Sequence, residues 1–323
     1  MGVDIIQRID FIGPSAAGKT TLLKQMLLEK KDSRKWVTPQ EARIEIAKQQ
    51  KYTLIKDSFP SFIFSNIYFL GKKNPHFLEA ALEKLLTDKY AKEFANHASD
   101  YNCLFEMLLD SWYVQKKYRR PYDKIRFIRF YESILFKDVA LLDNFEYKGV
   151  VICDDGIVHN NTGMDSSDAH QKLLCLSPEE RKKIIPDGVI YCKVPLEENI
   201  VRRKRRIASG NMTMHEQNIS DDELMQLSKK ALENVACKVK LLQDLDVPLL
   251  EIDMTKSYDE NIPLINSFID RTSDRISVEP VYRSSKTKER YNLINELRSY
   301  LFYLMEGLIG LIVIYAFSLQ ALF

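Results

Sequence analysis

Residues Ile5 to Lys24 read IIQRIDFIGPSAAGKTTLLK. Within this stretch, residues 13–20 (GPSAAGKT) match the pattern G-x-x-x-x-G-K-[ST] at every position. An apolar run precedes the first glycine, and a helix-like run, TLLKQMLL, follows the threonine. The motif therefore lies between a predicted strand and a predicted helix, which is the context that a phosphate-binding loop requires.

The residue types of this loop suit a bound phosphate. Glycine lets the backbone approach the anion closely and turn its N–H groups inward. A helix that begins near Gly18 adds unpaired N–H groups and the positive end of its dipole. We expect Lys19 to bridge the β- and γ-phosphates of a nucleoside triphosphate and the Thr20 hydroxyl to bind Mg²⁺. The residues predicted to contact the nucleotide are Gly13, Pro14, Ser15, Ala16, Ala17, Gly18, Lys19, Thr20 and Thr21.

Length and composition set broad limits. The 323 residues allow one large α/β domain with insertions or two smaller domains. The net charge of +2 gives no overall reason to expect a nucleic-acid partner. The five cysteines are scattered without a C-x-x-C pair, which indicates a reduced, cytoplasmic protein rather than a disulfide or zinc scaffold. The first eight residues do not have the pattern of a signal peptide.

A second informative stretch is GVVICDDG, residues 149–156. It reads as a buried strand that ends in two carboxylates, Asp154 and Asp155. Ligands bind at the carboxyl ends of parallel strands, where such a group can hold Mg²⁺ or accept a proton from a hydroxyl. The alternative is an ordinary polar Asp-Gly turn. The phosphate loop upstream favours the functional interpretation.

A third stretch begins at Pro195 as a helix and runs into RRKRR, residues 202–206. Successive helical residues are rotated by about 100°, so these five cations cannot all face one side. We expect some of them to point towards the strand ends. A solvated basic face is the alternative here. For the arginines and lysines of 116–129 a solvated basic face is the first expectation, and the alternative is that one or two of the arginines line an anionic substrate site.

The remaining pattern indicates an α/β protein with a doubly wound parallel sheet. Most of 76–145 has helical periodicity and reads as an insertion, whereas 52–70 fits either a strand pair or a turn and helix. Residues 157–176 read as a loop over the site, in which His159 is more simply a loop residue than an acid–base group. Strands are predicted over 5–12, 36–38, 149–153, 189–194 and 247–253, and helices over 18–30, 39–51, 178–185, 195–206, 221–244 and 257–270.

Four of these segments together carry a resemblance to a known superfamily. GPSAAGKTT, VVICDD, PDGVIYCKVPLEENIVRRKRR and VPLLEIDMTKSYDENIPLINSFI occur in the order found in P-loop nucleoside and nucleotide monophosphate kinase-like proteins. They are similar to its phosphate loop, acidic strand, strand–helix–lid segment, and final strand and helix. The resemblance covers about residues 5–270.

This resemblance implies ATP- and Mg²⁺-dependent phosphoryl transfer to a small-molecule acceptor. It implies that Thr20 and Asp154 hold the metal ion. The chain departs from the nucleoside kinases in having D-D-G where they commonly have an acidic residue followed by arginine, and in its long helical insertion. A nucleoside acceptor is therefore not implied. The catalytic residues implied by the resemblance are Lys19, Asp154, Asp155, Arg203 and Arg206.

Other classes of nucleotide-binding protein share the loop. An ABC-type ATPase is one alternative, although no L-S-G-G-Q signature precedes the acidic strand. A GTPase is disfavoured because no N-K-x-D motif is present. Hydrolysis of a nucleoside triphosphate and a non-catalytic, nucleotide-binding regulatory module both stay open.

The C-terminal residues differ in composition from the rest. We divide the chain into a P-loop domain (1–270), a polar, basic linker (271–299) and an apolar helix (300–323). The uncharged run Gly307–Phe323 has 17 residues and would span about 25 Å as a helix, slightly less than a bilayer core of about 30 Å. A membrane anchor on a cytoplasmic protein is one interpretation; packing against the domain or a second subunit is the other. The sequence does not indicate an oligomeric state.

Overall fold

The computed structural model describes residues 7–28, 34–51, 53–54, 75–114, 121–166, 168–211, 213, 216 and 219–273. The predictions for 274–323 and most of those for 52–70 lie outside these ranges. The described residues form two compact units, one made of 7–42 and 90–273 and the other of 43–89. The first unit contains the sheet and every residue predicted for the site. In the second unit, Arg43 pairs with Glu83 (Nε–Oε1, 2.8 Å).

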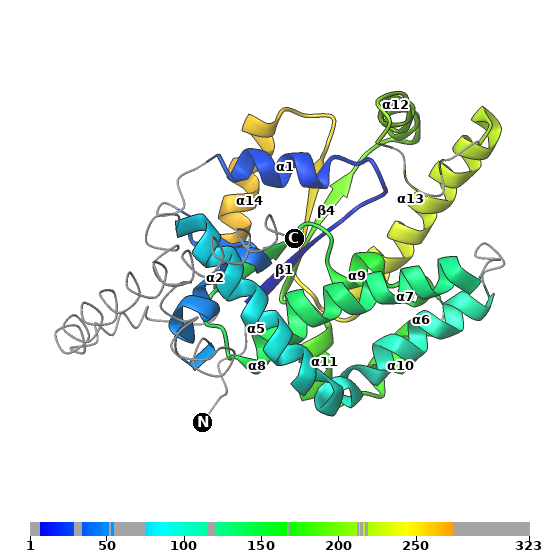
Figure 1. Ribbon diagram of the computed structural model, residues 1–323. Helices are drawn as coiled ribbons and strands as arrows, with labels where there is room; N and C mark the ends of the chain where they lie inside the picture. The colour runs from blue at the N-terminus through cyan, green and yellow to red at the C-terminus, as the bar shows by residue number, and fades with distance from the viewer. Residues whose placement is uncertain are drawn as a thin grey trace, which may run out of the picture. The chain divides into compact units, whose positions relative to one another are not determined.

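The first unit is built on a five-stranded sheet in which every paired strand is parallel, with the order β2-β3-β1-β4-β5 (Figure 1). The predicted α/β class is therefore confirmed. Strand order reverses beside β1, and in such sheets ligands commonly bind outside the carboxyl ends of the strands at this point. The strands are β1 (Gln7–Ile12), β2 (Trp36–Val37), β3 (Val150–Cys153), β4 (Gly188–Lys193) and β5 (Leu249–Asp253).

Helices follow the strands and also make up most of the described residues of the predicted helical insertion. A π-helical turn, η3 (Phe136–Ala140), joins two of them, and η2 (Ala98–Tyr101) and η4 (Thr162–Asp165) are 3₁₀-helices. The α-helices are α1 (Lys19–Met26), α2 (Pro39–Gln49), α5 (Pro75–His97), α6 (Asn102–Val114), α7 (Pro121–Leu135), α8 (Leu141–Asn144), α9 (Ile157–Asn160), α10 (Ala169–Leu174), α11 (Pro178–Ile184), α12 (Leu196–Ala208), α13 (Asp221–Asp244) and α14 (Tyr258–Ser273).

One face of the sheet is covered by α1 and α14 (Figure 1). Ile9 and Phe11 of β1 are fully buried on this face, and they belong to one cluster with Leu22 of α1 and with Ile265 and Phe268 of α14. Burial of each such side chain stabilises the fold by about 1.5–3 kcal/mol. The alternate side chains Ile9 and Phe11 of β1 therefore pack against the helix that follows the phosphate loop and help to fix its position.

The alternate residues of β1 place a buried ion pair on the other side of the strand. The Arg8 Nε atom lies 3.2 Å from Asp10 Oδ1, and both side chains are buried. Arg8 also donates from Nη2 to the Ile184 carbonyl at 2.6 Å. Burial raises the pKa of Asp10, and the Arg8 charge opposes that rise. The pair is needed because an unpartnered buried charge is costly.

Three predicted helix starts are confirmed in atomic detail. In each, a hydroxyl side chain accepts from the backbone N–H three residues later, and the glutamate at that position accepts from the backbone N–H of the capping residue. The caps are Thr38 with Glu41, Ser177 with Glu180, and Ser220 with Glu223.

The prediction of a loop over 157–176 is wrong. The segment contains α9, η4 and α10, and it is anchored by Asn161, which is fully buried. Asn161 Nδ2 lies 3.0 Å from the Tyr131 hydroxyl, and Asn161 Oδ1 accepts from the Gly163 N–H at 2.9 Å. Asparagine and glycine usually indicate a turn, but here the amide forms hydrogen bonds in the core.

We predict that Arg8→Met destabilises the protein by about 3–5 kcal/mol, because it leaves the Asp10 charge buried without its partner. The free energy of unfolding in urea at neutral pH measures this change. The double variant Arg8→Met/Asp10→Leu should recover part of the loss. A cost below about 1 kcal/mol for the single variant would contradict the role given to the pair.

Candidate functional site

The phosphate loop turns tightly between β1 and α1. A Cβ atom at Gly13 would lie 2.7 Å from the Cys192 carbonyl oxygen of β4. Gly18, at the amino end of α1, has φ 105°, and Ala16 has φ 65°. The two glycines are thus required by close approach and by backbone conformation, respectively. Among the described residues no side chain caps α1, so its first N–H groups are available to an anion.

Lys19 lies inside this turn and is buried. Its Nζ atom donates to the Gly13 carbonyl at 3.2 Å and lies 3.4 Å from His159 Nε2. Burial lowers the pKa of Lys19, and the Asp155 carboxylate acts in the opposite direction. Thr20 and Thr21 follow on the exposed side of the first turn of α1.

The acidic strand end lies beside the loop because β3 pairs with β1, with Asp10 opposite Cys153. Asp155 Oδ1 lies 3.3 Å from His159 Nε2. Burial raises the pKa of Asp155, and the Lys19 ammonium opposes that rise. Asp155 also affects the Lys19 ammonium more strongly than Asp154 does. We call Lys19, Asp155 and His159 the Lys19 cluster.

The structure thus brings Lys19 and Asp155 together and adds His159, which the sequence left as a loop residue. Burial, reinforced by the Lys19 and Lys238 charges, holds the pKa of His159 well below its usual range. Burial and the two ammonium groups thus disfavour the charged form of this imidazole. Asp155 and His159 are four residues apart in the sequence. Their side chains meet because residues 157–160 form a helical turn.

Helix α12 holds the loop from the other side. Asn199 donates from Nδ2 to the Ser15 carbonyl at 2.8 Å, and Arg202 donates from Nη1 to the Ala17 carbonyl at 2.7 Å. Arg206 donates from Nη1 to the Ser15 hydroxyl at 3.1 Å. Positions 199, 202 and 206 share one helical face. This spacing is a signal from which Asn199 and Arg202 could have been predicted.

Arg203 points away from the loop. It donates from Nη1 to Ser228 Oγ of α13 at 3.1 Å, and its Nε lies 3.2 Å from Glu216 Oε1. Arg206 also pairs with Glu216. Of the two arginines predicted to act on a phosphoryl group, only Arg206 is placed against the loop.

The described residues contain no group of three or more His, Cys, Asp or Glu side chains that could hold a metal ion. Magnesium does not require one, since it is commonly held by one or two carboxylates together with phosphate oxygens and water. Asp154 is half-buried at the end of β3, and Thr20 is exposed at the start of α1. A carboxylate and a hydroxyl are ligands that suit Mg²⁺, so these two residues fit that ion.

A cavity of about 560 Å³ is lined by residues of α1, α12 and α14. It is bounded by Gln25 of α1, by Arg202 and by the connection from β5 to α14, which includes Met254 and Ser257. Arg202 Nη2 donates to the Met254 carbonyl at 2.7 Å, which closes one side. Arg202 thus lines this cavity and also holds the Ala17 carbonyl of the loop.

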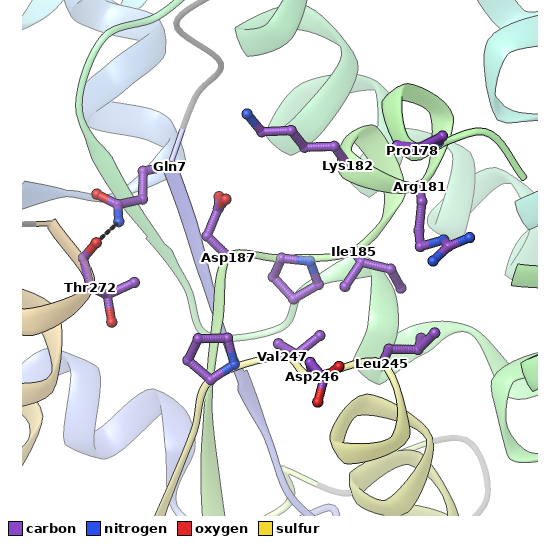
Figure 2. A pocket seen from close by; sticks show the side chains of 12 residues that line it. Gln7, Pro178, Arg181, Lys182, Ile185, Asp187, Leu245, Asp246, Val247 and Thr272 are labelled. Carbon is purple, nitrogen blue, oxygen red and sulfur yellow. Dashed lines mark hydrogen bonds between the residues drawn. The ribbon is translucent and has the colours of Figure 1, made fainter. Parts of the chain in front are cut away.

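A second cavity, of about 400 Å³, lies at the opposite edge of the sheet (Figure 2). Gln7, Asp187 and Val247 line it near the amino ends of β1, β4 and β5, and Gln7 donates to the Thr272 carbonyl at 2.6 Å. Because the phosphate loop follows the carboxyl end of β1, this cavity is not part of the phosphate site.

No protein-family model and no curated protein matches the sequence. A solved structure of deoxyadenosine kinase from M. mycoides, with products dCMP and a flexible dCDP bound, is 14% identical to this chain, with a TM-score of 0.33. The match covers 82% of this chain and 100% of that chain. A likeness this remote decides neither family nor activity, so the proposals below depend on the residues of this chain.

We predict that Arg202→Met lowers the free energy of unfolding by about 2–3 kcal/mol, because two buried carbonyl groups lose a charged donor. Urea unfolding measures the effect, and hydrogen exchange of the loop amides should accelerate. Arg205→Met is the matched control, since Arg205 is exposed on the same helix and its loss should cost less than about 0.5 kcal/mol. Equal effects of the two substitutions would contradict the loop-holding role of Arg202.

Proposed function

We propose that this protein is a Mg²⁺-dependent kinase that transfers the γ-phosphoryl group of ATP to a hydroxyl of a small molecule. The observation that carries the proposal is the Lys19 cluster. His159 Nε2 is 3.4 Å from Lys19 Nζ and 3.3 Å from Asp155 Oδ1. The phosphate loop and a carboxylate able to accept a proton therefore face the same small volume.

The donor nucleotide would bind along the loop. The backbone N–H groups of Gly13 and of residues 15–21, at the amino end of α1, would hold the phosphates, with Lys19 between the β and γ groups. The cavity of about 560 Å³ that Arg202 lines has room for the nucleoside part. When bound through Thr20 and Asp154, Mg²⁺ would neutralise phosphate charge.

Asp155 is the residue best placed to act on the acceptor. The direction of its pKa, raised from the ordinary value, favours acceptance of a proton by this carboxylate. The acceptor oxygen would attack the γ-phosphorus while the bond to the β-phosphate oxygen breaks, so that ADP leaves and the hydroxyl proton passes to Asp155. Arg206, held between Ser15 and Glu216, is the arginine positioned to stabilise the transferring group.

We also propose, from the sequence, that the protein is cytoplasmic and associates with a membrane through residues 300–323. Those residues lie outside the described part of the chain. Within the part that is described, no helix is long and apolar enough to cross a membrane. The proposal therefore depends on the apolar composition of the tail and the basic residues before it.

The kinase proposal predicts the behaviour of two variants in an acceptor screen. Purified protein with Mg²⁺ and labelled ATP is offered nucleosides, nucleotides, sugars and glycan intermediates. Lys19→Ala should abolish labelling of every acceptor, and Asp155→Asn should lower transfer by about 10²-fold or more, the size of a general-base contribution, while MgATP still binds.

Asp253→Asn is the matched control for that experiment, because Asp253 also ends a strand but is exposed and accepts from Thr255. Transfer that survives in Lys19→Ala would show that the assigned chemistry is wrong. Release of phosphate to water with every acceptor would indicate an ATPase. Binding of MgATP without turnover in the unmutated protein would indicate a regulatory module.

The membrane proposal predicts that deletion of 300–323 moves the protein from the membrane fraction to the soluble fraction of disrupted cells. The shortened protein should keep its MgATP turnover, because the site residues lie between 13 and 206. Recovery of the full-length chain in the soluble fraction without detergent would contradict the anchor.

A further inference from the structure

Lys238 of α13 is a buried lysine for which the proposed chemistry gives no role. Only 4% of its surface is exposed, and lysine is almost never this buried without a partner. Its Nζ atom donates to the His159 carbonyl at 2.7 Å and lies 3.2 Å from Asp165 Oδ1. One ammonium group thus connects α13, α9 and η4.

The turn that Lys238 contacts cannot hold its own shape. Helix α9 is a single turn of four residues, and a helix this short is not stable alone. Asn160 ties the turn to the acidic strand end by donating from Nδ2 to the carbonyls of Asp155 (2.8 Å) and Gly156 (3.1 Å). The last carbonyls of a helix lack partners within it, and Lys238 binds one of them.

We infer that Lys238 is a positioning residue for the proposed phosphoryl transfer. By holding the His159 carbonyl, it fixes the α9 turn and keeps the His159 imidazole and the Asp155 carboxylate facing Lys19. The inference rests on the proposed function.

The charges around this turn agree with that role. The Lys19 and Lys238 ammonium groups both lower the pKa of the Asp155 carboxyl and of the His159 imidazole. Burial lowers the pKa of Lys238, and the Asp165 carboxylate opposes that change. The Asp165 carboxylate thus favours the charged form of Lys238, while the bond to the His159 carbonyl is a separate contact.

A purely structural role is the competing explanation, in which Lys238 only neutralises Asp165. Variants that remove one contact of Lys238 at a time distinguish the two explanations. Asp165→Asn removes the countercharge but keeps the bond to the His159 carbonyl. Lys238→Met removes that bond and leaves the Asp165 charge buried, whereas the double variant removes the bond without leaving a charge.

The experiment uses the full chain and measures kcat and KM for MgATP by ADP release, together with urea unfolding. We expect Lys238→Met to lower kcat at least tenfold, because displacing a catalytic group by about 1 Å can cost about 10²-fold, with KM for MgATP within twofold. Lys238→Met/Asp165→Asn should regain stability but not kcat. Asp165→Asn should keep kcat within threefold of the unmutated value. Lys238→Arg should retain part of the kcat that Lys238→Met loses.

Lys240→Met is the matched control, because Lys240 is exposed on the same helix and pairs with Asp244. It should behave like the unmutated protein. If Lys238→Met does not fold, the double variant gives the same comparison. A kcat that returns with stability in the double variant, or a normal kcat in Lys238→Met, would overturn the inference. Turnover that persists in Lys19→Ala would instead overturn the proposed function.

Discussion

The close approach of the phosphate loop to β4 constrains much of the first unit. The loop passes so near the Cys192 carbonyl that only glycine fits at position 13, and it begins α1 from a left-handed Gly18. The close approach at Gly13 and the left-handed conformation of Gly18 together fix the positions of the loop carbonyls. Helix α12 can then hold Ser15 and Ala17 from the other side, so the loop is preorganised without its own secondary structure.

Around this fixed loop, the site balances buried charges. The Asp155 and Asp165 carboxylates favour the charged forms of Lys19 and Lys238, while burial lowers the pKa of His159. Each charge has a partner of opposite sign, which buried ionic groups require. The acidic strand end, a one-turn helix and α13 therefore form one network, in which a change at α13 can reach the groups that face the loop.

Much of the fold could be predicted because its signals lie in consecutive residues. The loop motif, the apolar strands and the capping boxes each depend on a few neighbours, and the structure contains all of them. The loop predicted over 157–176 failed for the opposite reason. Asn161 has the composition of a turn, and only its partners on α6 and α7, the Leu104 carbonyl and the Tyr131 hydroxyl, make it a core residue.

The sequence by itself determined the α/β class and the phosphate loop, since both depend on local pattern. Only the tertiary structure decided which cations face that loop. Arg202 and Arg206 do so and Arg203 does not, because helical phase and the packing of α13 set the direction of each side chain. Lys238 meets His159 across 79 residues of chain. No pattern in either segment predicts that contact, because it depends on how the two helices pack.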